Sequence, residues 1–404
     1  MSEVVEHIVV GAGISGLGLA HRAARRGIPT LVVESADRVG GCINSRTFAG
    51  GDDFWAEAGS HTCFNSYGHL IDTLSDLGML GGLTAKEKVK YFLWRGGERR
   101  AVLSALHPLE LAVSLPRLLA GKKAGRSVRE FYGAGLGRKN YRDLFGPAFR
   151  AVICQDADDF PADLLFRRKP RRKEILRSFT FPGGLSDIPR AIAAQEGLEV
   201  RAGQGVVGLR RDGDGFRLAT DGGGELRCVT LTLAVPPDVA SALLAHDFLA
   251  LADAVGGIGV EEVQSVALCV PVERVAHLPP LAGLIAVDDA FNSMVSRDYL
   301  ADDRYRGFTF HFRPGALEAD AQVERACAAL GIAPGDLAGV ERALNRLPAL
   351  RVGHGERIAR VDAALAGTRL GITGNWFLGV SIEDCLTRSS QEDERLFGTT
   401  RGEL

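Results

Sequence analysis

The order of apolar and polar residues predicts an amino-terminal strand–helix–strand unit. Ile8–Val10 is a short, continuous apolar run, which is typical of a strand buried on both faces of a parallel sheet. Apolar residues then recur with helical spacing between residues 17 and 23, and Gly27 ends this helix. Thr30–Val33 forms a second apolar run. The pattern therefore favours two parallel strands joined by a crossover helix.

The rest of the chain changes pattern at several points. Residues 85–180 are mainly helical, whereas the segment from residue 181 predicts a helix and then strands near 198–201, 206–210, 215–220 and 228–235, with D-G and G-G turns between them. Residues 246–350 hold further strands and a helix near 320–331. The end of the chain, from residue 370, predicts a strand, a loop and a helix.

These changes predict an α/β fold in five segments. Residues 1–78, 181–245 and 351–404 should form a Rossmann-like cofactor domain, with a parallel sheet and a β-meander. Residues 79–180 should form a helical cap and the first part of an inserted, mixed α+β substrate domain, and residues 246–350 its second part.

Composition narrows the class of protein. Hydrophobic residues make up 46% and charged residues 24% of 404 residues, as in ordinary globular proteins. A net charge of −2 gives no reason to expect a nucleic-acid partner, and the acidic amino terminus does not resemble a signal peptide. The seven cysteines form no C-x-x-C pair, so we expect reduced thiols and a cytoplasmic location. No metal-ligand spacing or catalytic triad stands out.

Glycines at the first strand–helix turn predict a dinucleotide site. Gly11, Gly13 and Gly16 form G-x-G-x-x-G, and Glu34 ends the second strand. The glycines allow a tight turn and a close approach to a diphosphate, while the helix start at Ile14 and Ser15 offers unpaired N–H groups. The carboxylate of Glu34 can accept hydrogen bonds from both hydroxyls of a ribose.

The next stretch favours FAD over a nicotinamide cofactor. After Ser35 come Arg38, the doublet Gly40-Gly41 and Cys42. This doublet resembles the second diphosphate-contacting turn of flavoproteins built like glutathione reductase and the amine oxidases. Arg38 could neutralise phosphate or be a solvated turn residue. "EAGSHTCF", residues 57–64, resembles the E-x-G-P-x-x-F stretch that passes the flavin, with Ser60 in place of proline.

Four further passages resemble one family, the FAD-dependent protoporphyrinogen oxidases of the monoamine-oxidase-like superfamily. They are "FTFPGGLSDIPRAIA", "RLPALRVGHGERI" (346–358), "AVICQDADDF" (151–160) and "KYFLWRGGE" (90–98). Amine oxidases usually carry arginine where this chain has Cys42. Departures from the family lie at Lys90, where relatives have a propionate-binding arginine, at Gln155, where they have glycine, and at Ala157, where they have proline.

The resemblance implies a set of site residues. Those expected to bind FAD are Gly11, Gly13, Ile14, Ser15, Gly16, Glu34, Ser35, Arg38, Gly40, Gly41, Cys42, Ala58, Gly59, Ser60, His61, Val206, Ala234, Gly374, Asn375, Gly379, Val380, Ser381 and Ile382. Lys90, Gln155 and Trp376 are expected to contact substrate. Ser381 with Asp384 predicts a helix N-cap, which would aim backbone N–H groups at the reducible ring.

The implied reaction requires no strong base. A porphyrinogen would lose hydride from a bridging methylene to the flavin, with dioxygen as the final acceptor, in tetrapyrrole biosynthesis. His61, His311 and His354 are the histidines to watch, although each is more often a packing or capping residue. Catalytic residues cannot be assigned from the sequence.

Alternatives remain open at this point. The same fold serves oxidases and desaturases of amines, carotenoids or specialised metabolites, and a flavin-binding protein without turnover is a third reading. The helix in residues 107–123 is apolar on one side with basic residues near its end, so it suits a cap-domain core or, less often, a membrane surface. A monomer and a homodimer are both compatible with the sequence.

Overall fold

The computed structural model describes residues 4–51 and 53–398 and contains two seven-stranded sheets. The first sheet has the order β10-β2-β1-β13-β12-β11, and β19 also pairs with β13. Its strands are β1 (Val4–Val10), β2 (Thr30–Val33), β10 (Leu198–Arg201), β11 (Val206–Asp212), β12 (Gly215–Thr220), β13 (Glu225–Leu233) and β19 (Leu370–Ile372). The β1, β2, β10, β13 and β19 pairings are parallel, whereas β11, β12 and β13 form an antiparallel meander.

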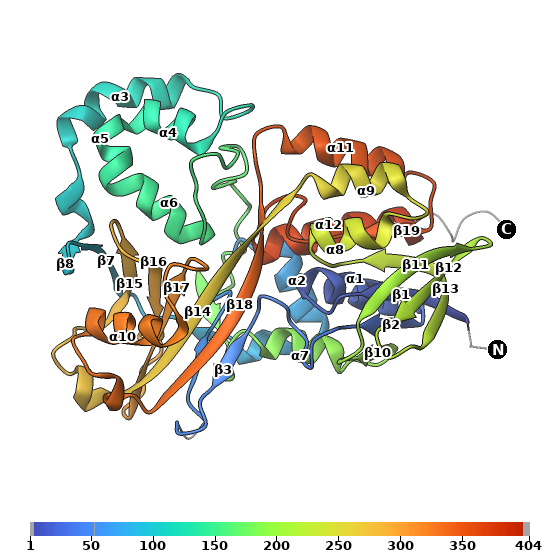
Figure 1. Cartoon of the computed structure of the whole chain (residues 1–404), viewed down its shortest axis with the longest axis horizontal. Helices are drawn as coiled ribbons and strands as arrows, with labels where there is room; N and C mark the ends of the chain where they lie inside the picture. Colours follow the sequence, from blue (N-terminus) through green and yellow to red (C-terminus); the bar gives the residue numbers. More distant parts are fainter. Residues whose placement is uncertain (1–3, 52, 399–404) are drawn as a thin grey trace.

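Helices cover both faces of this sheet, because successive strand residues point to opposite sides. On one face, Ile8 and Leu31 pack with α8 (Pro237–Leu244), α9 (Leu249–Gly256) and α11 (His354–Leu365). On the other face, Val9 and Val32 pack with α1 (Ile14–Arg25), α7 (Asp187–Ala193) and α12 (Ile382–Phe397), and α2 (Gly68–Asp76) joins the same cluster. The result is a three-layer domain, on the right in Figure 1. The expected α/β fold with a parallel sheet and meander is confirmed.

The second sheet forms the substrate domain, with the order β18-β14-β17-β16-β15-β7-β8. Its strands are β7 (Lys90–Arg95), β8 (Glu98–Ala101), β14 (Gly259–Pro271), β15 (Leu281–Ala286), β16 (Phe291–Ser296), β17 (Tyr305–Phe312) and β18 (Gly339–Ala349). One face packs under α10 (Ala319–Leu330) around a cluster of phenylalanines. The long strands β14 and β18 run from this domain toward the first sheet's helices (Figure 1).

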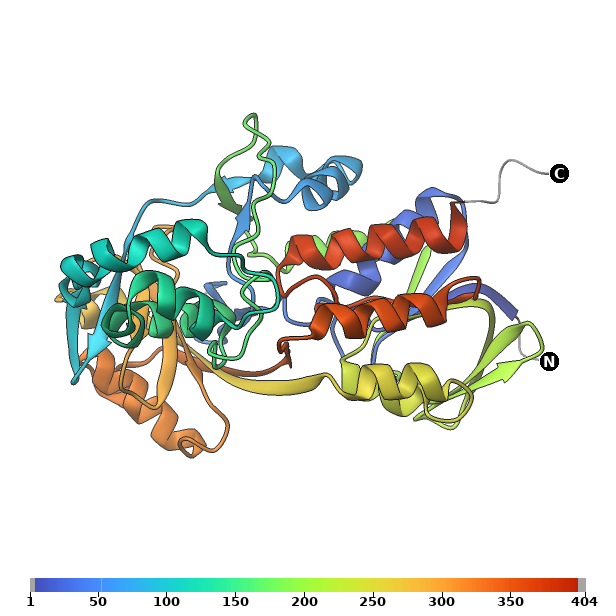
Figure 2. The ribbon, with the colours of Figure 1, turned by 90° about the horizontal axis from the view of Figure 1, so that it is seen from above.

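A helical cap stands beside the substrate sheet. It consists of α3 (Pro108–Ala120), α4 (Val128–Leu136), α5 (Arg138–Asn140) and α6 (Gly146–Ile153), and α6 contacts β15 and β16 on the face opposite α10. Figure 2 shows these helices at the far end of the molecule from α11 and α12.

The remaining elements are short. They are the strands β3 (Ser45–Thr47), β4 (Trp55–Glu57), β5 (Cys63–Phe64), β6 (Thr84–Ala85) and β9 (Ser178–Thr180), the 3-10 turns Met79–Gly82, Val102–Ala105, Val272–Val275 and Pro334–Asp336, and a π-helical turn at Tyr141–Phe145. All seven cysteines are free. Across residues 4–51 and 53–398, no helix combines the length and apolar character needed to cross a bilayer.

Candidate cofactor and substrate site

Two glycine turns lie against each other and form a cradle at the carboxyl end of β1. Gly13 and Gly40 are joined by a parallel β-bridge, and the Gly40 N–H donates to the Ala12 carbonyl oxygen at 2.8 Å. A Cβ on Gly11 would lie 2.5 Å from the Ala234 carbonyl oxygen, whereas a Cβ on Gly13 would meet no atom within 4 Å. Backbone atoms therefore fill the space beside Gly11, whereas the space beside Gly13 is open.

The start of α1 suits an anion in that space. Gly13 is its N-cap, no side chain caps it, and its first turn carries no acidic residue. The N–H groups of an uncapped first turn and the helix dipole favour a diphosphate. Ile14 and Ser15, which were also predicted to bind FAD, are buried at this helix start. The chemistry of the cradle thus fits the diphosphate of FAD.

Glu34 lies beside the cradle as predicted for a ribose anchor. Its Oε2 accepts from the Ala12 N–H at 2.7 Å and its Oε1 from the Ala36 N–H at 2.9 Å. The Glu34 carbonyl oxygen accepts from the Gln204 N–H, which brings Val206 close to the same strand end. Ser35 is exposed next to this carboxylate, with its Oγ 3.3 Å from Glu34 Oε1.

Arg38 shapes the second glycine turn. Its guanidinium donates to the carbonyl oxygens of Gly41 (2.8 Å), Val39 and Ile43 (both 3.3 Å). Gly41 adopts a φ of 56°, and a Cβ there would lie 3.2 Å from the Gly13 Cα. Because burial lowers the Arg38 pKa without abolishing its charge, the residue can hold the turn while adding positive charge beside the cradle.

The carboxyl-terminal stretch passes the same end of the sheet. β19 pairs with β13, and the Thr373 N–H donates to the Leu233 carbonyl oxygen, so Gly374 and Asn375 follow next to the Ala234 loop. Ser381 caps α12, since its Oγ accepts from the Asp384 N–H at 3.1 Å. The predicted N-cap is present, and it places Gly379, Val380 and Ile382 around the helix start.

A lysine from a distant segment reaches this helix start. Lys169 Nζ lies 2.7 Å from Asp384 Oδ1 and 2.9 Å from Ser381 Oγ. Lys169 belongs to a run of basic residues, 167–173, and its side chain reaches α12. No sequence signal marks it, because the contact joins residues more than 200 positions apart.

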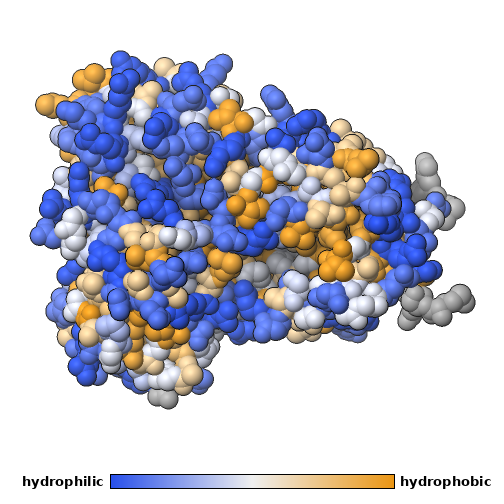
Figure 3. Space-filling view, in the orientation of Figure 1, coloured by the Kyte–Doolittle hydropathy of each residue, from blue (hydrophilic) through white to orange (hydrophobic). Residues whose placement is uncertain are grey.

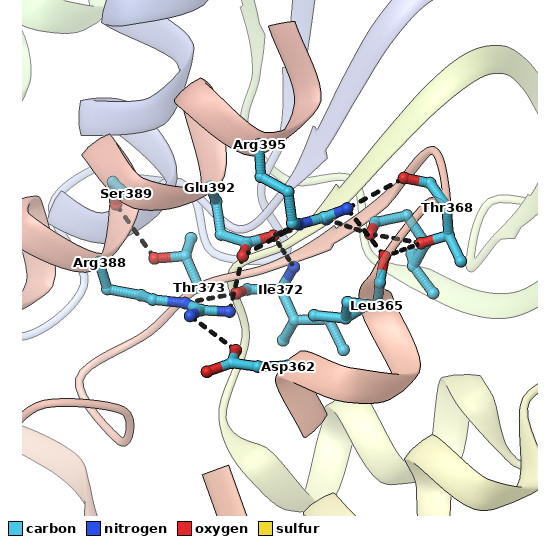
Figure 4. A network of polar contacts seen from close by, with 10 residues as sticks. Asp362, Leu365, Thr368, Ile372, Thr373, Arg388, Ser389, Glu392 and Arg395 are labelled. Atoms are coloured by element: carbon cyan, nitrogen blue, oxygen red, sulfur yellow. Dashed lines mark hydrogen bonds and ion pairs between the residues drawn. The ribbon is translucent and has the colours of Figure 1, made fainter. Parts of the chain in front are cut away.

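A buried polar network packs against the carboxyl-terminal segment that contains β19 and the loop after it (Figure 4). Glu392 pairs with Arg388 and Arg395 at 2.7 Å, and its Oε2 accepts from the Ile372 N–H. Arg388 also pairs with Asp362 of α11. These contacts tie β19, α11 and α12 together and so fix the loop that carries Gly374–Ser381.

The junction between the two domains is the candidate substrate site. The Ser60 N–H donates to the Cys42 carbonyl oxygen at 2.8 Å, which places the Gly59–His61 segment beside the second glycine turn. Asn345 Nδ2 of β18 donates to the Ala58 carbonyl oxygen at 2.8 Å and to Ser265 Oγ at 3.0 Å. A substrate-domain side chain therefore fixes the segment expected to pass the flavin.

Two neutral histidines lie at this junction, His311 on the substrate sheet and His61 on the segment beside the second glycine turn. His311 Nδ1 lies 3.0 Å from Ser293 Oγ, and burial lowers the His311 pKa to about 4. Burial, followed by the positive charge of Lys86 and by His311, lowers the His61 pKa to about 3. Both imidazoles are therefore uncharged at neutral pH. His354 lies elsewhere, buried at the start of α11.

Two further titratable groups approach the junction: Lys86, which was not predicted, and Glu57, which begins the segment expected to pass the flavin. Lys86 Nζ donates to the His61 carbonyl oxygen and to Thr62 Oγ1, both at 2.7 Å, and lies 3.4 Å from the Tyr299 ring centroid. Burial lowers the Lys86 pKa to about 8. Burial raises the Glu57 pKa to about 7, although the Leu185 N–H and Ser45 Oγ donate to its carboxylate.

The three predicted substrate residues do not come together. Lys90 begins β7, and strand alternation places it with Phe92 and Trp94, which pack on the α10 face, away from His311. Trp376 is fully buried, stacked on Phe377 with centroids 4.1 Å apart, and its Nε1 donates to the Val235 carbonyl oxygen. The assignments of Lys90 and Trp376 to the substrate pocket are therefore corrected.

Gln155, the third residue predicted to contact substrate, remains a candidate for that role. It follows α6 directly after Cys154, and its Nε2 donates to the Pro348 carbonyl oxygen at 3.1 Å. Its buried Oε1 has no hydrogen-bond partner in the described part of the chain, so it can accept a bond from a ligand. Within residues 4–51 and 53–398, no group of three or more His, Cys, Asp or Glu side chains is arranged to hold a metal ion.

Comparison with known proteins gives the family. The sequence model of the flavin containing amine oxidoreductases matches residues 14–277. The flavin-dependent L-tryptophan oxidase RebO of Lentzea aerocolonigenes is 32% identical over 162 residues, which are 39% of this chain and 33% of that protein. AofH of Mycobacterium tuberculosis, named as a flavin-containing monoamine oxidase, is 26% identical over 266 residues, 58% of this chain and 57% of that protein. The matches thus span a third and 57% of these relatives' lengths.

Solved structures share the whole fold. A protein from Exiguobacterium sp. 255-15, assigned as a protoporphyrinogen oxidase, superposes with a TM-score of 0.77 at 17% identity, covering 98% of this chain and 99% of that one. A UDP-galactopyranose mutase gives 0.75 at 14% identity, covering 99% and 97%. At these identities the likeness shows the fold alone.

Proposed function

The chain belongs to the flavin-containing amine oxidoreductases, with FAD as cofactor, and we propose that it is an oxidase removing hydride from a porphyrinogen. Bound FAD supplies a two-electron acceptor, and dioxygen takes the electrons on to peroxide. The sequence passages shared with protoporphyrinogen oxidases support this substrate. The full-length structural likeness to a protein assigned to that activity agrees with it.

The observation that carries the proposal is the place of the terminal aromatic pair. Amine oxidases commonly present two aromatic side chains before the flavin, and Trp376 and Phe377 are this chain's candidates in the terminal stretch. Both are buried in the core, stacked on each other, with Arg388 3.9 Å from the Phe377 ring centroid. They cannot frame an amine, which favours a substrate that needs no such pair.

The junction residues suit the uncharged pyrrole rings of a porphyrinogen. His61 and His311 are neutral, and a neutral imidazole accepts a hydrogen bond from a pyrrole N–H. After a bridging methylene loses hydride, the pyrrole becomes a strong acid, so a weak base is enough to take its proton. Gln155 Oε1 offers a further acceptor.

A second candidate is oxidation of an amino acid or amine. It is favoured by the similarity to the L-tryptophan oxidase and to AofH, both of which match part of this chain. A desaturase of polyenes is the third member of this set, since a 15-cis-phytoene desaturase of Narcissus pseudonarcissus is 35% identical over 88 residues.

A substrate panel in air separates these candidates. Protoporphyrinogen or coproporphyrinogen should give a fluorescent porphyrin with three molecules of peroxide each, because three two-electron oxidations are needed. L-Tryptophan, putrescine and phytoene should give neither peroxide nor product. The Lys90→Met variant serves as a control that should leave KM unchanged, since Lys90 lies on the α10 face of β7. Peroxide with an amine alone would overturn the proposal.

A further inference from the structure

Helix α12 begins with two acidic residues, Glu383 and Asp384, close to the expected place of the flavin ring. Ile382 of the same turn packs in one apolar cluster with Ile14 of the glycine cradle and with Cys63, which follows the segment expected to pass the flavin. The helix therefore begins between the diphosphate site and the junction. Two-electron reduction places negative charge on the flavin ring, so an uncompensated carboxylate at this helix start would oppose reduction.

The charge of Glu383 is used at a different helix. Its carboxylate accepts from the His69 N–H at 3.0 Å and from the Leu70 N–H at 3.2 Å, in the first turn of α2. No side chain of its own caps α2, because the N-cap residue Tyr67 makes no such bond. The N–H groups and the dipole of α2 therefore stabilise the Glu383 carboxylate, which caps that helix.

The charge of Asp384 stays beside the loop that leads into α12. A Cβ on Gly379 would lie 2.7 Å from Asp384 Oδ2, so this carboxylate lies against the Gly379 backbone. Ser381 Oγ donates to the same carboxylate oxygen and accepts from the Asp384 N–H. Since the hydroxyl is neutral, these hydrogen bonds hold the carboxylate in place without cancelling its negative charge.

Lys169 brings a positive charge to Asp384 from a distant segment. Its Nζ lies 2.7 Å from Asp384 Oδ1 and 2.9 Å from Ser381 Oγ. Polar and charged side chains cover most of the face drawn in Figure 3, whereas the side chains of Lys169 and Asp384 are only 22% and 14% exposed. Water and salt therefore screen this pair less than an ion pair on the surface. The Ser381 hydroxyl now uses its one hydrogen and both lone pairs, which leaves its backbone N–H for FAD.

We propose that Lys169 tunes the reduction potential of bound FAD by cancelling the charge of Asp384 at the start of α12. With the ion pair intact, the N–H groups and the dipole of the helix start act on the ring without a net negative charge among them. Loss of the lysine leaves Asp384 to repel the negative charge that reduction brings, which favours oxidised flavin. Lys169 acts through Asp384 and does not contact the substrate, so its role is the same whichever substrate reduces the flavin.

The two-electron reduction potential of FAD in the full, FAD-loaded chain tests the proposal, measured against a reference dye and without any porphyrinogen. Lys169→Met should make reduction roughly tenfold less favourable, which is about 30 mV more negative. Lys169→Arg keeps the positive charge and should keep the wild-type potential. Lys169→Met combined with Asp384→Asn should restore that potential, because the charge that needed compensation is gone.

The matched control is Lys173→Met, the same change in the same basic run, since Lys173 is exposed and should not affect the potential. Asp384→Asn alone leaves the lysine uncompensated and should make reduction more favourable. FAD content and the urea midpoint are measured for each variant, because a purely structural role of Lys169 would lower the midpoint without a potential that Asp384→Asn restores. The proposal is overturned if Lys169→Met or Asp384→Asn has the wild-type potential, or if the double variant keeps the potential of Lys169→Met.

Discussion

Glu34 contacts both backbone segments that meet at the glycine cradle. One carboxylate oxygen accepts from Ala12 in the first turn and the other from Ala36 beyond the second strand. Its position therefore depends on backbone contacts within the first strand–helix–strand unit. A carboxylate held this way is ready to accept the hydroxyls of the adenosine ribose.

The Glu34→Ala variant should retain FAD poorly. Loss of a charged acceptor for hydrogen bonds costs about 1.5–3 kcal/mol, which corresponds to a Kd increased on the order of 10- to 100-fold. Flavin content after gel filtration measures this, and Glu199→Ala on the neighbouring strand β10 is the exposed control. Stoichiometric FAD in Glu34→Ala would refute the ribose assignment.

The buried His7 makes the stability of the cofactor domain depend on pH. Its ring nitrogens lie 3.2 Å from Thr30 Oγ1 and 3.0 Å from Thr232 Oγ1, and burial lowers its pKa to about 3. Below pH 6.5 the unfolded chain binds a proton at this histidine and the folded chain does not. The contribution of His7 to stability is therefore complete above pH 6.5 and declines as pH falls.

The His7 contribution to the free energy of unfolding should drop by about 2 kcal/mol between pH 6.5 and pH 5. Denaturant titrations at both pH values should show this loss in the wild type and a smaller loss in His7→Gln. The exposed His246 provides the control, because His246→Gln should keep the wild-type pH dependence. Equal pH dependence in wild type and His7→Gln would rule out the effect.

The stability of helix α12 depends on the buried carboxylate of Glu392. The side chain is buried between Arg388 and Arg395 and accepts from the Ile372 N–H of β19 (Figure 4). Removing one partner from a buried ion pair leaves uncompensated charge, which is strongly destabilising. The network therefore couples the stability of the helix to the position of the cofactor loop.

Glu392→Gln should lower the free energy of unfolding by about 3 kcal/mol or more, with a lower urea midpoint. Glu394→Gln is the matched control on the same helix, because its side chain is 70% exposed and its ion pair with Arg26 is worth little. A Glu392→Gln midpoint equal to that of the wild type would show that the network carries no stability.

Sequence patterns predicted elements better than side-chain encounters. The strands of the meander and the cap on α12 follow from local periodicity and spacing. Lys169, Lys86 and Asn345 were missed because no local pattern links them to their partners, which lie 212, 25 and 287 positions away. Lys90 was misplaced because family resemblance fixes a position in the alignment but not the strand face, and Trp376 because an aromatic near the cofactor can equally well be core.

For the whole molecule, the site is the place where two sheets meet. The cofactor sheet supplies the glycine cradle and Glu34, and the substrate sheet supplies Asn345, Ser293 and His311. Asn345 bridges them through the Ala58 carbonyl oxygen. FAD held by the cradle would present its ring at the junction, so the chemistry would depend on both domains at once.

We propose that a porphyrinogen gives its electrons to FAD held at this junction. Anaerobic mixing of the purified, FAD-loaded protein with protoporphyrinogen or coproporphyrinogen tests it most directly, with the visible flavin absorbance followed in time. We predict that the absorbance bleaches with a porphyrinogen and returns, with peroxide, when air is readmitted. Flavin that stays oxidised with both porphyrinogens, while an amine, an amino acid or a polyene bleaches it, would contradict the claim.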